Sequence, residues 1–185
     1  MQLKNDESRY GVVAQFFHWA VVVLIIVQFF LANRADDLPL GPAKIAVLAR
    51  HKSVGITILA LVLLRLIWRW INTVPPEPQT VPRWQRIAAR VSHISLYALL
   101  LTTPIIGWLM SSARNFSVSW FGLVTLPDFI EPNRAAYDVL HETHEFMALT
   151  LLCLALLHIA AALKHHFVDR DDVLRRMLPF TSKRP

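Results

Sequence analysis

The sequence predicts an all-α integral membrane protein, a bundle of four transmembrane helices, and three observations support this fold class. Hydrophobic residues make up 55% of the 185 residues and charged residues only 17%, a balance typical of membrane proteins. Four apolar stretches are each long enough to cross a bilayer as a helix. Gly is scarce and no alternating strand pattern stands out, so helices are the expected form of all four spans.

The four apolar stretches end at charged or proline-rich sequence, and 1–185 is expected to form a single membrane domain. Pro104 is expected to kink the third span because proline has no N–H to donate, and Gly107 nearby permits close packing. A loop over 112–137 precedes the last span. The expected spans are 12–32, 45–71, 87–112 and 139–167.

The distribution of positive charge predicts the orientation of the bundle. Of the 19 Lys and Arg residues, 13 lie near the termini and the second loop, and 6 lie near the first and third loops. An excess of positive charge marks the cytoplasmic side, so both termini are expected in the cytoplasm. The segment before the first span lacks a small-residue cleavage site, so this span is expected to be retained. The net charge of +6 then indicates contact with anionic lipid headgroups and not with nucleic acid.

Four histidines lie in the apolar spans at two depths. His144 and His158 are fourteen residues apart, so their rings lie within ~40° of one helix face and ~21 Å apart along it. With the predicted orientation, His51 lies at the outer depth with His144, and His18 at the inner depth with His158. Ionisable residues inside a membrane are costly, and two neutral imidazoles suit the axial positions of a haem iron. The pattern predicts two bis-histidine haems, held non-covalently because no CxxCH motif occurs.

Two further residues share a helix face with His51. Gly55 lies one turn after it, where a missing side chain lets a flat macrocycle approach. Arg65 lies fourteen residues after it, level with the inner pair. A guanidinium inside the membrane needs a partner, so we expect Arg65, together with Arg69, to meet a propionate of the inner haem.

Basic residues on the outer side have two interpretations. Arg50 and Lys52 flank His51, and Arg114 begins the third loop. They are candidates for steering a small anion towards the outer haem. Anchoring to lipid headgroups explains each of them equally well.

The remaining histidines of the spans have competing interpretations. His141 lies seventeen residues before His158, which turns it ~100° away from that face, so His144 is the preferred ligand. The stretch HETHE is not the HExxH zinc motif, although His141, His144 and Glu145 leave a surface zinc site as an alternative. His93, in the third span, is expected to be a hydrogen-bonding residue and not a ligand.

Motifs spread over nearly the whole chain resemble those of the bacterial cytochrome b561 family. They are FFHW, RHKSVGITILALVLLRLIWR followed by PP, HISLYALLLTTPIIGW, HE and, further along, LHIAAALKHHF, and LRRMLP. The resemblance implies a b-type cytochrome of the bacterial inner membrane, a four-helix bundle that holds two haems. It also implies that His165 lies near a quinone site, and that the axial ligands are His18, His51, His144 and His158.

The resemblance further implies electron transfer across the membrane. Superoxide oxidases of this family oxidise superoxide at the outer surface and reduce ubiquinone, so we expect electrons to pass from the outer haem to the inner haem and then to ubiquinone. Other members are haem b subunits of membrane dehydrogenases or hydrogenases, which makes docking to such a partner the main alternative. A haem-free membrane protein that binds a metal or has a structural role is an alternative of another class. His165, at the end of the last span, is then either an interfacial anchor or a proton donor to the quinone.

Overall fold

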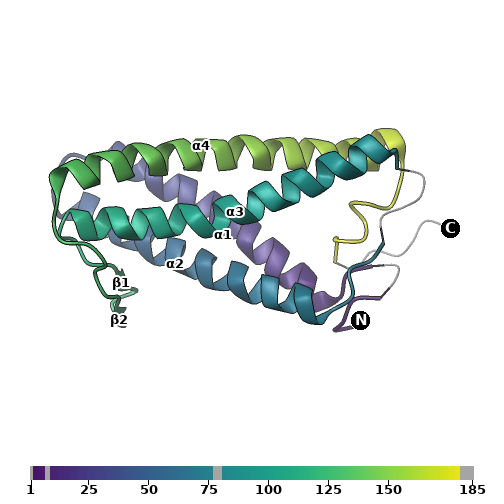
Figure 1. The fold of residues 1–185 in the computed structure, drawn as a ribbon, viewed down its shortest axis with the longest axis horizontal. Helices are drawn as coiled ribbons and strands as arrows, with labels where there is room; N and C mark the ends of the chain where they lie inside the picture. Colours follow the sequence, from purple (N-terminus) through teal and green to yellow (C-terminus); the bar gives the residue numbers. More distant parts are fainter. Residues whose placement is uncertain (1, 7–8, 77–80, 180–185) are drawn as a thin grey trace.

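Four long helices dominate the computed structural model, which describes residues 2–6, 9–76 and 81–179 (Figure 1). Each of the four is long and apolar enough to cross a membrane. This confirms the predicted all-helical class with four candidate spans. The helices are α1 (Val12–Asp36), α2 (Pro42–Ile71), α3 (Arg83–Ala113) and α4 (Arg134–Lys164), which is continued by the five-residue π-helix η1 (His165–Asp169).

The helices extend beyond the apolar stretches that the sequence analysis delimited. The first apolar stretch stops at residue 32, yet α1 continues to Asp36. Pro42 lies in the first turn of α2, where its missing N–H would have no helical partner in any case. The side chain of Asn133 caps α4 by accepting a hydrogen bond from the backbone N–H of Ala136. Backbone hydrogen bonding therefore extends the helices into charged sequence, beyond the points at which the apolar stretches end.

A short antiparallel ribbon interrupts the connection between α3 and α4, and the sequence analysis missed it. Strands β1 (Ser119–Trp120) and β2 (Val124–Thr125) are joined by a turn in which Gly122 has a φ of 74°. Trp120 Nε1 donates a hydrogen bond to the Thr57 hydroxyl at 3.0 Å, so the ribbon is fastened to α2. We call this end of the bundle the hairpin end.

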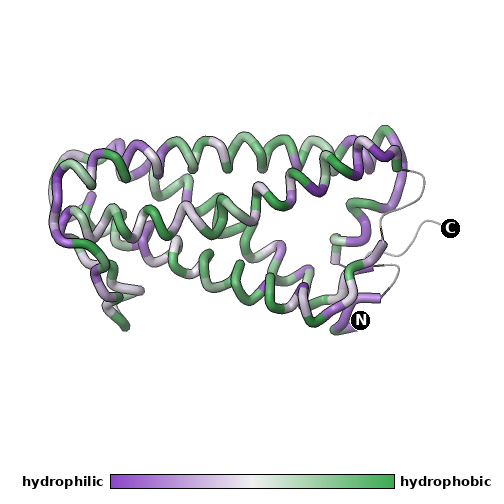
Figure 2. The backbone as a smooth tube through the Cα atoms, viewed as in Figure 1, coloured by the Kyte–Doolittle hydropathy of each residue, from purple (hydrophilic) through white to green (hydrophobic). Residues whose placement is uncertain are grey.

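The helices pack in chain order. α1 packs on α2, α2 on α3 and α3 on α4, whereas no Cα atom of α4 lies within 8 Å of α1 or α2 in the part of the chain that the structure describes. The buried core lies where these faces meet and consists of Val21, Val54, Ile58, Val62, Leu100 and Leu151. Most other apolar side chains face outwards, and Figure 2 shows hydrophobic residues along the helices with hydrophilic ones gathered at both ends. This is the surface expected for contact with lipid.

The α3 helix is bent partway along its length (Figure 1). Pro104 lies inside it and has no N–H to donate to the carbonyl of Leu100. The described chain ends, near Gln2 and Pro179, lie together at the opposite end from the ribbon. We call that end the termini end.

Candidate functional site: two groups of histidines

The hairpin-end pair consists of His51 on α2 and His144 on α4. Their ring centroids are 6.3 Å apart, and the ring planes meet at 71°. Both side chains are half-buried. The two rings therefore meet across helices whose backbones do not approach each other closely.

Each ring of this pair makes one hydrogen bond through a ring nitrogen. The Nδ1 atom of His144 lies 3.0 Å from the carbonyl oxygen of Thr103, which can only accept, so Nδ1 carries the hydrogen. The side-chain amide of Gln28 lies 3.0 Å from Nε2 of His51, so these two polar groups are hydrogen-bonded. His144 thus carries its hydrogen on Nδ1, which leaves its Nε2 lone pair able to bind a metal ion.

Glycine makes room for the ring of His144. A Cβ atom added at Gly107 would lie 2.9 Å from Cε1 and 3.1 Å from Nδ1 of His144, well inside van der Waals contact. The imidazole therefore lies against the backbone of α3 at Gly107 and donates its hydrogen bond to the carbonyl oxygen of Thr103 in the same helix. Only glycine at position 107 allows this approach.

The termini-end cluster consists of His18 on α1, His93 on α3 and His158 on α4. The centroids of His18 and His158 are 6.4 Å apart with the ring planes at 69°. His93 lies closer to His158, at 5.4 Å and 65°. Nδ1 of His18 is buried and has no hydrogen-bond partner among the described residues. Arg65 lies within charge–charge range of the cluster, and its guanidinium is 5.3 Å from the centroid of the Tyr97 ring.

The spacing of two of these ring pairs fits a shared metal ion. An imidazole nitrogen lies ~2 Å from a metal that it binds and the ring centre lies ~1 Å further back, so two rings on opposite sides of one ion have centroids ~6 Å apart. The pairs His51–His144 and His18–His158 match this value at 6.3 Å and 6.4 Å. Two imidazoles on opposite sides of one iron are the donor set of a low-spin haem. The residues present therefore fit an iron porphyrin at each end.

The other predicted site residues lie in more varied surroundings. A Cβ at Gly55 would lie 3.3 Å from the Gln28 amide nitrogen, so the space over Gly55 faces that side chain. Lys52 donates to the Ser111 hydroxyl at 2.8 Å, and Arg114 lies over the Tyr137 ring at 4.6 Å. The Arg50 side chain is exposed at the same end.

The zinc alternative finds no support in the geometry. His141 has a side chain that is 42% exposed and lies 3.6 Å from Glu145, whereas His144 points towards α3. Among the described residues, the one group of three or more His, Cys, Asp or Glu side chains close enough to share a metal ion is His165, Asp169 and Asp171. In that group Nδ1 of His165 is 2.6 Å from an Asp171 carboxylate oxygen.

Three residues at these sites were missed by the sequence analysis or assigned another role. His93 was expected to be a hydrogen-bonding residue, yet its ring packs against that of His158, and its side chain makes no hydrogen bond to a described residue. The signal was present, because His93 and Gly107 are fourteen residues apart, the same spacing as the two α4 histidines. Gln28 and the Thr103 carbonyl left no comparable signal, since their roles depend on how the helices are rotated against one another.

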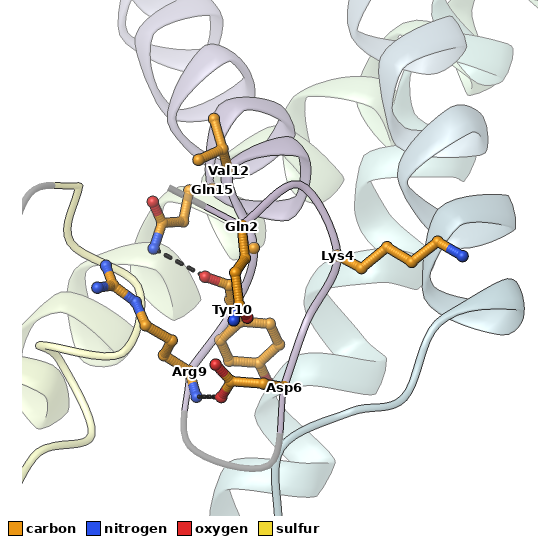
Figure 3. Close-up of a pocket in the computed structure, with 8 residues that line it drawn as sticks. Gln2, Lys4, Asp6, Arg9, Tyr10, Val12 and Gln15 are labelled. Carbon is orange, nitrogen blue, oxygen red and sulfur yellow. Dashed lines mark hydrogen bonds between the residues drawn. The ribbon is translucent and has the colours of Figure 1, made fainter.

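Described residues near both ends of the chain lie against α1 beside the termini-end cluster. Trp19 packs edge-on against His18 and donates a hydrogen bond to the Met177 carbonyl at 2.9 Å. A neighbouring cavity has a volume of about 290 Å³, and its lining side chains are drawn in Figure 3. Among them the Gln15 amide donates to the Tyr10 carbonyl at 3.0 Å. The cavity contains no histidine and is lined by Gln2, Lys4, Asp6, Arg9, Tyr10, Gly11, Val12 and Gln15.

Known proteins resemble the chain over almost its full length. A family model described as prokaryotic cytochrome b561 matches residues 9–180. Cytochrome b561 homolog 2 of Escherichia coli (strain K12) is 35% identical over 194 residues, covering 96% of this chain and 95% of the relative. A probable superoxide oxidase, CybB, of Yersinia pestis is 29% identical, covering 93% of this chain and 97% of the relative. Cytochrome b562 of Cereibacter sphaeroides is 27% identical, with 94% and 98% covered.

Proposed function

The chain belongs to the prokaryotic cytochrome b561 family, and from this membership we propose that it is a dihaem electron carrier of the bacterial inner membrane. The family implies b-type haem and electron transfer. We propose that the protein oxidises superoxide at the periplasmic face and reduces ubiquinone, with both chain termini in the cytoplasm. The resemblance to a probable superoxide oxidase and the excess of positive charge near the termini support these two points.

The observation that supports two haems best is the spacing of the two imidazole pairs. His51 and His144 would hold one haem, and His18 and His158 the other, each pair at the separation that one iron requires. A bis-histidine haem supplies a one-electron carrier with no free position for a substrate. The protein's contribution would be to place two such carriers at different depths and, through the Thr103 carbonyl, to keep His144 in its metal-binding form.

The overall reaction balances with ubiquinone as the acceptor. Two superoxide ions each lose one electron and become dioxygen, and one ubiquinone takes up the two electrons and two protons to become ubiquinol. Arg50, Lys52 and Arg114 lie at the hairpin end, where a positive potential would attract the superoxide anion. At the other end, His165 contacts Asp171 and is the candidate to pass protons to the quinone.

The test is haem content followed by turnover. Purified protein should show a low-spin bis-histidine spectrum with two haems per chain, and superoxide together with ubiquinone should yield ubiquinol without another protein. His51→Ala should lose the hairpin-end haem and abolish the reaction. Two haems without this activity, together with copurification of a dehydrogenase, would favour the electron-transfer-subunit alternative. Protein that stays colourless when haem is supplied would refute both.

A further inference from the structure

The α3 helix supports both proposed haem ligands of α4, although the proposal assigns no ligand to α3 itself. Among the long helices described, only α3 brings its backbone within 8 Å of α4. The α3 helix is therefore the neighbour whose backbone lies nearest to α4 and to its two histidines. What α3 places beside each of them differs between the two ends.

At the hairpin end the support is a hydrogen bond. The Thr103 carbonyl accepts from Nδ1 of His144 at 3.0 Å, and the absent side chain of Gly107 lets the ring lie against the helix. A partner for the nitrogen that does not bind the metal fixes both the tautomer and the orientation of the ring.

At the termini end the support is a second imidazole. His93 meets His158 at 5.4 Å with the ring planes at 65°, an edge-to-face arrangement. This distance is shorter than the ~6 Å needed for two rings on opposite sides of one metal ion. His18, at 6.4 Å from His158, meets that requirement. The spacing therefore favours His18 over His93 as the partner of His158 at the metal ion.

We propose that His93 is the positioning residue of His158. Its ring packs edge-on against the imidazole and sets the plane in which His158 faces the iron, the task that the Thr103 carbonyl performs for His144. The inference rests on the proposed function only in requiring haem at the termini end. In this role His93 acts through the shape of its ring, because its side chain makes no hydrogen bond to a described residue and contacts His158 edge-on.

The experiment compares His93→Ala with His93→Phe. The ferric low-spin electron paramagnetic resonance signal depends on the relative planes of the two axial imidazoles, so it reports the position of His158 directly. His93→Ala should keep both haems but shift the signal and the reduction potential of the termini-end haem, and should weaken haem retention there by about tenfold. His93→Phe should give the wild-type signal, because the phenyl ring can again pack edge-on against His158. Thr102→Ala, at an exposed position of α3, is the matched control.

Three results would overturn the role of His93. The first is an unchanged termini-end signal in His93→Ala, and the second is a Phe variant that behaves like the Ala variant. The third is loss of the termini-end haem in His93→Ala while His18→Ala keeps it, since His93 would then be the ligand. A wild-type protein without haem would overturn the proposed function as well, whereas two haems with an unchanged spectrum overturn the positioning role alone.

Discussion

The substitution Gly107→Ala tests whether the approach of α3 to His144 controls the hairpin-end site. The new Cβ would lie 2.9 Å from Cε1 and 3.1 Å from Nδ1 of His144. Carbon atoms in contact normally lie ~3.5–4 Å apart, so the ring or α3 must move by at least ~0.5 Å. A shift of that size lengthens the 3.0 Å hydrogen bond to the Thr103 carbonyl and turns the ring away from His51. Loss of such an orienting partner typically lowers metal affinity by ~10–100-fold.

The assay for Gly107→Ala is haem titration into apoprotein, combined with electron paramagnetic resonance of the ferric state. The hairpin-end haem should bind more weakly and change its signal, whereas the termini-end haem should remain as in wild type. Gly41→Ala is the matched control, because nothing lies within 4 Å of the Cβ that it adds. A Gly107→Ala protein with two haems of unchanged affinity and spectrum would show that the close approach is incidental to ligation.

Three further predictions separate the roles of individual residues. His144→Ala should lose the hairpin-end haem while His141→Ala keeps both, as measured by haem per chain; the opposite pattern would exchange their roles. Arg65→Gln should lower the reduction potential of the termini-end haem in a spectroelectrochemical titration, because a positive charge favours the reduced iron, and it should leave the other potential in place. Raising the ionic strength should slow superoxide oxidation, since salt screens the attraction exerted by exposed cations such as Arg50; a salt-independent rate would argue against steering.

The sequence predicts the helices and the ring pairs well because both depend on local periodicity. Hydropathy is a property of a continuous stretch, so four spans can be recognised without any knowledge of their packing. The spacing of His144 and His158 likewise depends only on helix geometry. Matching them with His51 and His18 requires depth in the membrane, which the order of the spans supplies. The structure brings together the pairs expected on these grounds.

The features that the sequence did not predict depend on how one helix is rotated against another. His93 was assigned a hydrogen-bonding role because its spacing from Gly107 places both on one face of α3 but does not say which neighbour that face meets. The contact between His144 and a backbone carbonyl leaves no residue type to recognise. The ribbon was missed because two residues per strand are too few to show an alternating pattern. What fastens it is the hydrogen bond from Trp120 to Thr57 of α2, a contact that the loop sequence alone does not reveal.

The packing order of the helices links cofactor binding to the association of α4 with α1 and α2. In the described chain α4 contacts α3 but does not bring its backbone within 8 Å of α1 or α2, so it approaches those helices only through side chains. The paired rings span the remaining distance at 6.3 Å and 6.4 Å. A cofactor held by such rings joins α4 to the α1–α2 pair, so its binding energy adds to the stability of the bundle, by ~4 kcal/mol at a concentration a thousand times the dissociation constant.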